Sequence, residues 1–333
     1  MMLRSRLFPT LLLTAICLTF SSIVHAVIPP EELGYPPQAG PLITSSWGQR
    51  APYNYMCPLT SPTPWGGYLP AEDHCRVGCV AVAIGQIMRY HRWPLEGDGE
   101  ASVVYPLASA NSHTFTVDFS QASYDYDAML DDYSSTEYTE REGRAVAELL
   151  YHCAVASQMI FGQSASATTN FATAEALGRN FRYDTSLIET KIRYLYTERQ
   201  WMDMVYHELS EGRPIFYEAI DLSLTRGSYA HSFVVDGYRE DGYVHVNWGW
   251  NGQQDGYYDI AQLDPDGYRF NFYQDMTIGI RSPQAEPESI LPPPSTINHQ
   301  PSTIYTLDGR RMSSREALPP GIYVSGGRKF VVR

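Results

Sequence analysis

The stretch Val80–Tyr90 constrains the fold of this chain more than any other. Nearly every position in "VAVAIGQIMRY" is apolar or small, and the stretch holds no proline. A helix that is apolar almost all the way round is stable only where neighbours cover every side. We therefore predict a buried helix over residues 79–91 that crosses the centre of a sizeable domain.

Cys79 stands at the first position of this helix, directly after Gly78. Unpaired N–H groups and the positive end of the dipole favour an anion at a helix N-terminus. The pKa of a cysteine there can fall to roughly 3.5–7.5, and the same N–H groups can bind an oxyanion. A cysteine at the N-terminus of a helix therefore indicates a nucleophile at Cys79. The alternatives are a disulfide, a buried inert thiol, and a zinc site with His74, Cys75 and His91, which no second CxxC-type pair supports.

His231 is the histidine best placed to act as a base for such a nucleophile. It opens the strand-like run 231–238 directly after a glycine-containing loop, where a side chain can face a cleft, although a lone histidine there is otherwise a surface residue. The run 243–250 follows a typical hairpin turn, so Asn247 and Trp248 are expected nearby. An amide oxygen that accepts from the imidazole would fix its tautomer, and an indole would shield that bond from water.

Helical patterns dominate the first half of the chain and strand patterns the second. Helices are expected over residues 79–91, 140–161, 173–181 and 199–212, and strands over 214–220, 231–238, 243–250, 256–263 and 276–280. Helices first and an antiparallel sheet later indicate an α+β fold rather than alternating βαβ units.

The two ends of the chain differ from the central unit, residues 27–282. Residues 1–26 combine two arginines, an apolar core and a small-residue cleavage site, which is typical of a secretory signal peptide. Residues 283–303 are rich in proline and serine and indicate a linker, and residues 304–333 indicate a short β module. We expect a secreted protein, extracellular or on the outer cell surface, that passes through the periplasm.

The net charge indicates which partners the chain can bind, and the number of cysteines indicates how many disulfides it can form. The formal net charge is −13 at pH 7, a field that repels nucleic acid and anionic lipid, so neither is an expected partner. The apolar run of the signal peptide is too short for a stable membrane span. Four cysteines follow the predicted cleavage site: Cys57, Cys75, Cys79 and Cys153. In an oxidising compartment the default expectation for four cysteines is two disulfides.

Four segments together resemble the streptopain family of secreted bacterial cysteine peptidases, peptidase family C10. They are "WGQRAPYNYMCP", "GCVAVAIGQIMRYHRWP", "AHSFVVDGY" and "HVNWGWNGQQDGYYDI", in the family order over roughly residues 45–282. The resemblance implies a papain-like fold with a helical half around the nucleophile helix and an antiparallel β half. It also implies a cysteine endopeptidase that acts on proteins or peptides and needs no metal or organic cofactor.

The resemblance also implies roles for single residues. Cys79 matches the family nucleophile and His231 the general base. Gln49 matches the glutamine whose side-chain N–H completes the oxyanion hole with the Cys79 backbone N–H. Asn247 and Trp248 match the pair that supports the histidine.

Two further residues are assigned to substrate binding by the same resemblance. The carbonyl of Ala230 would hold the substrate main chain, and Ser166, in the loop 162–170, would contact substrate from the other wall. The family usually carries a large propeptide, whereas only about 20 residues separate the predicted cleavage site from the first motif, so either no inhibitor is built in or a separate inhibitor protein serves. Cys57 and Cys75 could form a disulfide before Cys79, and residues 304–333 resemble sorting modules of exported bacterial proteins.

Two other classes of function stay open at the level of sequence. One is a non-catalytic binding or inhibitor-type protein on the same fold, against which the presence of Cys79, His231 and Gln49 argues. The other is an acyltransferase that uses the same Cys–His pair with an amine acceptor in place of water. Product analysis with added amines separates it from a peptidase.

Overall fold

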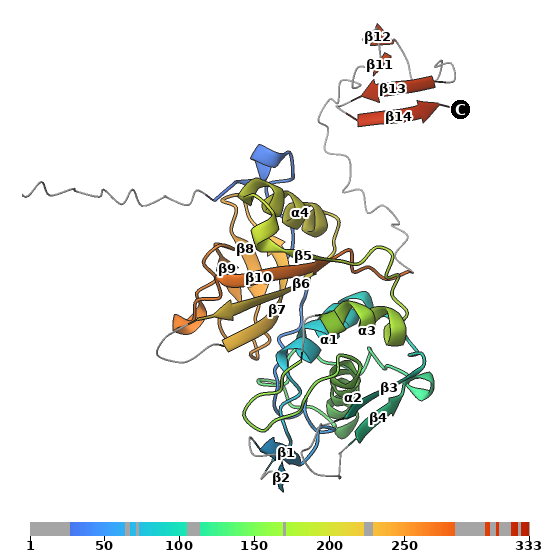
Figure 1. Cartoon of the computed structure of the whole chain (residues 1–333), viewed down its shortest axis with the longest axis vertical. Helices are drawn as coiled ribbons and strands as arrows, with labels where there is room; N and C mark the ends of the chain where they lie inside the picture. Colours follow the sequence, from blue (N-terminus) through green and yellow to red (C-terminus); the bar gives the residue numbers. More distant parts are fainter. Residues whose placement is uncertain are drawn as a thin grey trace, which may run out of the picture. The chain divides into compact units, whose positions relative to one another are not determined.

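The computed structural model describes residues 27–63, 67–70, 73–104, 114–168, 171–222 and 229–283, together with the C-terminal strands. The chain divides into two compact units, Met1–Gln284 and Ala285–Arg333 (Figure 1). The predicted signal peptide and nearly all of the predicted linker lie outside the described residues.

The helical half is built on α1 (Cys79–His91), which confirms the predicted central helix. Its residues Val80–Met88 are all buried, and it packs against α2 (Glu140–Ala156). The third helix, α3 (Phe171–Phe181), also packs on α2. The hairpin of β3 (Glu100–Val104) and β4 (Thr114–Asp118) covers α2 further (Figure 1).

The helix α2 is shorter than predicted. It begins at a capping box, in which Thr139 and Glu142 satisfy each other's backbone N–H groups. It ends at Ala156, whereas the apolar pattern continues to residue 161. Gln158 has a φ of 57°, a left-handed conformation that stops a right-handed helix whatever the apolar pattern beyond it.

The β half is one antiparallel sheet of six strands in the order β5-β10-β6-β7-β8-β9. The strands are β5 (Glu189–Ile192), β6 (Ile215–Asp221), β7 (Tyr229–Tyr238), β8 (Val244–Asn247), β9 (Gly256–Tyr258) and β10 (Phe272–Ile278). The predicted α+β fold is confirmed. The edge strand β5 was not predicted, and β9 is shorter than predicted because the Asp259 carboxylate accepts a hydrogen bond from the Ala261 N–H and turns the chain.

The sheet separates two apolar cores. On one face, Phe216 and Val234 join the core around α1 and α2. On the other face, Tyr217 and Phe233 join a second core with α4 (Glu198–Ser210). Alternate residues of β6 and β7 therefore point to different cores, as the period of a strand requires. The same packing sets the start of α1 against β7.

The remaining elements are small. They are the hairpin of β1 (Thr60–Thr63) and β2 (Gly67–Pro70), and the 3₁₀ turns η1 (Pro30–Leu33), η2 (Phe119–Gln121), η3 (Arg193–Leu195) and η4 (Pro265–Gly267). The C-terminal unit is a four-stranded antiparallel sheet, β12-β11-β13-β14, made of β11 (Ile304–Thr306), β12 (Arg311–Met312), β13 (Gly321–Ser325) and β14 (Arg328–Val332). Within the described ranges, every helix is too short or too polar to cross a bilayer.

Candidate active site

Cys79 lies where α1 meets β7. The helix begins at Gly78, which has a φ of 94° and supplies no side-chain cap, so the first N–H groups of α1 stay available. The Cys79 thiol is free and half-buried. The backbone N–H groups of Ser232 and Val80 and the Ser232 hydroxyl lie close enough to its sulfur to lower the pKa of the thiol. Ser232 follows His231 in β7, so Cys79 lies against the strand that bears His231, although the His231 ring itself packs with Phe233 and Trp248 on the other face of the sheet.

The protonation state differs from the sequence-based expectation of a lowered thiol pKa. Removal from water raises the pKa of Cys79, and this effect outweighs the hydrogen bonds that lower it. Burial likewise lowers the pKa of His231 to about 4. The helix N-terminus favours a thiolate, but enclosure disfavours each charge taken alone. Both shifts favour the uncharged forms, a neutral thiol and a neutral imidazole, near neutral pH.

The imidazole of His231 sits in an aromatic cage and is fully buried. The Trp250 ring stacks on it with ring centroids 4.9 Å apart, and Trp248 lies nearly parallel at 6.2 Å. His231 Nε2 lies 2.8 Å from the Trp248 carbonyl oxygen. A carbonyl only accepts, so Nε2 carries the proton and Nδ1 is the basic nitrogen. Nδ1 is buried and has no hydrogen-bond partner among the described residues.

Asn247 does not make the contact that the sequence led us to expect. Its Oδ1 accepts from Gln86 Nε2 at 2.9 Å and from the Gly249 N–H at 3.1 Å, and its Nδ2 donates to the Ser45 carbonyl at 2.7 Å. The support of the His231 tautomer comes from the Trp248 carbonyl instead. Asn247 positions the loop that holds that carbonyl.

Gln49 lies on the loop that faces the start of α1. Its carbonyl accepts from the Val77 N–H at 3.2 Å, two residues before Cys79. The preceding segment is fixed by Gln86, whose Oε1 accepts from the Ser45 hydroxyl at 3.0 Å and from the Trp47 N–H at 3.2 Å. The Gln49 side chain is half-buried, and its role in the oxyanion hole stays a prediction.

Gln86 is the residue that the sequence analysis missed. It is fully buried in α1 and connects the Gln49 loop, through Ser45 and Trp47, to the His231 support, through Asn247. The available signal was an uncharged polar residue in an otherwise apolar helix. Position 86 lies seven residues after Cys79, two turns up the same face of the helix.

The two predicted substrate-binding residues differ in exposure. Ala230 is exposed in β7, directly before His231, so its carbonyl role stays a prediction. Ser166 is 8% exposed, and its hydroxyl donates to the Arg76 carbonyl at 2.5 Å and accepts from the Gly162 N–H at 2.9 Å. These bonds tie its loop to the chain that leads into Cys79, a structural task, and a contact with substrate stays a prediction as well.

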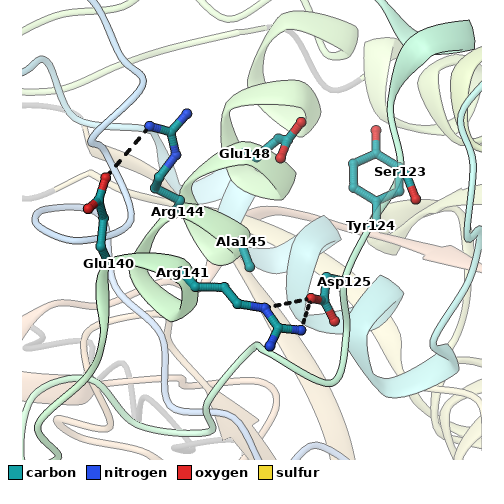
Figure 2. A pocket seen from close by; sticks show the side chains of 8 residues that line it. All are labelled: Ser123, Tyr124, Asp125, Glu140, Arg141, Arg144, Ala145 and Glu148. Carbon is teal, nitrogen blue, oxygen red and sulfur yellow. Dashed lines mark hydrogen bonds and ion pairs between the residues drawn. The ribbon is translucent and has the colours of Figure 1, made fainter.

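Figure 2 shows a charged surface pocket built from other elements. Its walls are the first half of α2 and the segment Ser123–Asp125. Arg141 pairs with Asp125, and Arg144 lies 3.9 Å from Glu140, so these ions are compensated within the pocket itself. Neither the start of α1 nor β7 contributes to the lining, and the pocket is not part of the candidate active site.

Comparison of the sequence with known proteins shows the family to which the chain is similar. A model of the peptidase C10 family matches residues 47–258. The thiol protease/hemagglutinin PrtT of Porphyromonas gingivalis is 31% identical over 261 residues, which are 75% of this chain and 27% of PrtT. Streptopain of Streptococcus pyogenes is 29% identical over 248 residues, 71% of this chain and 60% of streptopain. The chain therefore spans less than two thirds of these relatives.

Solved structures give the same result. Active interpain A cysteine protease of Prevotella intermedia superposes with a TM-score of 0.69 at 37% identity, covering 77% of this chain and 100% of that one. A prointerpain A fragment gives a TM-score of 0.64 at the same 37% identity over 77% of this chain and 76% of the fragment. The fold is papain-like, as the sequence resemblance implied. With a match over most of residues 27–283, the chain belongs to the peptidase C10 family.

Proposed function

We propose that this protein is a cysteine endopeptidase in which Cys79 is the nucleophile and His231 the general base. One observation carries the proposal. A free thiol at the uncapped start of a buried helix lies against the strand that bears a histidine with one ring nitrogen bound and the other without a partner among the described residues. Nucleophile, base and orienting group are the three parts that nucleophilic catalysis requires.

The proposed reaction gives each of these residues one task. Nδ1 of His231 takes the thiol proton as the Cys79 sulfur bonds to the scissile carbonyl carbon, and the resulting oxyanion accepts from the Cys79 N–H and the Gln49 side chain. The carbonyl re-forms as the C–N bond breaks, and His231 gives the proton to the leaving amine. Water then loses a proton to His231 and attacks the thioester, which releases the carboxylic acid and returns the thiol.

Removal of either member of the pair tests the proposal. Cys79→Ala and His231→Ala are each expected to lower kcat/KM for hydrolysis of an unfolded protein by at least about 10³-fold, as for other nucleophile–base pairs. The matched control is Cys153→Ala, which removes a buried free thiol from the α1–α2 core. Cleavage by Cys79→Ala at the wild-type rate would refute the assignment.

Export forms part of the same proposal. It is supported by the charged, apolar and small-residue regions of residues 1–26, in the order of a secretory signal. Mass measurement of the protein recovered from culture medium is expected to show loss of these residues. Recovery of the intact chain from the cell interior alone would contradict export while leaving the chemistry of Cys79 unaffected.

A further inference from the structure

A buried carboxyl lies one hydroxyl group away from the Cys79 sulfur. Glu218, on β6, stands directly opposite Ser232 of β7 and is 8% exposed. The Ser232 hydroxyl donates to Glu218 Oε2 at 2.9 Å, and it also lies close enough to the Cys79 sulfur to lower the pKa of that thiol. A hydroxyl has a single proton, so it can donate to the carboxyl or to the sulfur but not to both.

The groups around Glu218 determine which form it takes. Those that face it are Asp275 from β10, which is in register with it, Ser232 from β7 and Cys79 from α1. Burial is the largest effect, and with the negative charges of Asp275 and of ionised Cys79 it raises the pKa of Glu218 to about 8. Near neutral pH, therefore, Glu218 is mostly a neutral acid with a proton of its own to donate.

The form of Glu218 sets the direction of the hydrogen bonds. An ionised carboxylate only accepts, so it takes the Ser232 proton and adds a negative charge beside the sulfur. A protonated carboxyl can donate to Ser232 Oγ, and the Ser232 proton is then directed to Cys79. Hydrogen bonds to the charged form of a group stabilise that form, so only the second arrangement favours the thiolate.

We propose that Glu218 is a positioning residue for the nucleophile: as a neutral acid it directs the Ser232 hydroxyl to the Cys79 sulfur, and on ionisation it withdraws that bond. The proposal rests on the proposed function only in that the sulfur must be the reacting group for the effect to change catalysis. Its physical content, a coupling between Glu218 and the thiolate, does not require that any peptide is cleaved.

The rate of alkylation at Cys79 tests this coupling directly. Full-length protein is treated with iodoacetamide between pH 5 and 10, and the Cys79 peptide is quantified by mass spectrometry. Wild type is expected to show two coupled titration steps, because each ionisation opposes the other. Glu218→Gln, whose amide always donates to Ser232, is expected to show one step at lower pH. Its rate at pH 8 should be about tenfold higher, the effect of one hydrogen bond to a charged group.

Two further variants fix the route of the coupling. In a Ser232→Ala background the effect of Glu218→Gln is expected to fall by at least about half, because the hydroxyl link is gone. The matched control is Glu240→Gln, the same chemical change on an exposed residue in the turn that follows β7, and it should leave the profile unchanged. A Glu218→Gln profile that coincides with wild type overturns the proposal.

Asp275→Asn decides the question should Glu218→Gln fail to fold. It keeps the Ser232–Glu218 bond and removes a neighbouring charge, so the step assigned to Glu218 is expected to move to lower pH, and an unmoved step overturns the assignment. Peptide hydrolysis by wild type is measured in parallel. Absent hydrolysis with a shifted alkylation profile counts against the proposed function alone, whereas hydrolysis with identical profiles counts against the role of Glu218 alone.

Discussion

At the scale of single residues, the candidate site depends on amides and carbonyls that the motifs do not single out. The Trp248 carbonyl fixes the His231 tautomer, and Gln86 joins the two loops on either side of the pair. A buried polar group of this kind is stabilising only while all its partners are satisfied. Gln86 is consequently a residue whose loss is expected to affect stability and turnover together.

Gln86→Met tests this role because methionine has a similar volume and cannot form the three bonds. We expect the free energy of unfolding to fall by about 2–4 kcal/mol, since three buried polar partners lose a hydrogen bond. We also expect kcat to fall more than KM changes, because the loops that bear Gln49 and Trp248 lose their common anchor. Urea unfolding and steady-state kinetics measure the two effects. Gln253→Met, on an exposed loop, is the control, and equal effects in both variants would contradict the role.

At the scale of elements, the junction between α1 and β7 decides where the sulfur lies. Gly78 directly precedes the first residue of α1, and the space at its α-carbon is filled. A Cβ built there would lie 2.7 Å from Met159 Cε and 3.3 Å from Ser166 Cβ, at a φ of 94°. The left-handed backbone and the close approach both require glycine. The entry into α1 is therefore fixed by packing from the loop that carries Ser166.

Gly78→Ala is expected to cost more than backbone strain alone. Strain at a positive φ is of order 1–3 kcal/mol, and the clash with Met159 adds to it and displaces the first turn of α1. Gly34→Ala is the matched control, because Gly34 has a φ of 83° with no atom within 4 Å of the added Cβ. Thermal unfolding and kcat/KM are compared for the two variants. Full activity in Gly78→Ala would show that the first turn tolerates displacement.

At the scale of the whole molecule, buried ionisable groups link stability to pH. Burial lowers the pKa of His91, His152 and His231 to about 4 from 6.5, so the unfolded chain binds protons that the folded chain does not. Their contribution to stability is lost as the pH falls from 6.5 through 4. Burial raises the pKa of Asp255 to about 6 and of Glu218 to about 8, and these contributions are lost as the pH rises through those values.

The balance predicts maximum stability near pH 6.5. Below it the three histidines outweigh the two acids, and between pH 6.5 and 8 Glu218 alone lowers stability by up to about 1.4 kcal/mol per pH unit. The free energy of unfolding, measured by urea titration at pH 5, 6.5 and 8, tests this pH dependence of stability. Glu218→Gln should remove the decline on the alkaline side. A wild-type stability that rises steadily from pH 5 to 8 would be inconsistent with the burial of Glu218.

Local sequence patterns alone determined several features of this protein. The apolar pattern predicted α1 and the division into a helical and a β half. A helix that is apolar all round must be buried on every side, and a strand of alternating character must bury one face. The position of Cys79 after a glycine and of His231 at a strand start marked the two residues that we propose as nucleophile and base. These features depend on neighbours in sequence, which the sequence shows directly.

Only the tertiary structure decided which groups serve that pair. Asn247 is opposite Val234 on the face of the sheet that meets α1, so its amide reaches Gln86, while His231 lies with Phe233 and Trp248 on the other side. Glu218 meets Ser232 only through the register of β6 on β7. Local alternation shows which residues of one strand share a face, but which residues of two strands meet depends on how distant segments pair in the sheet.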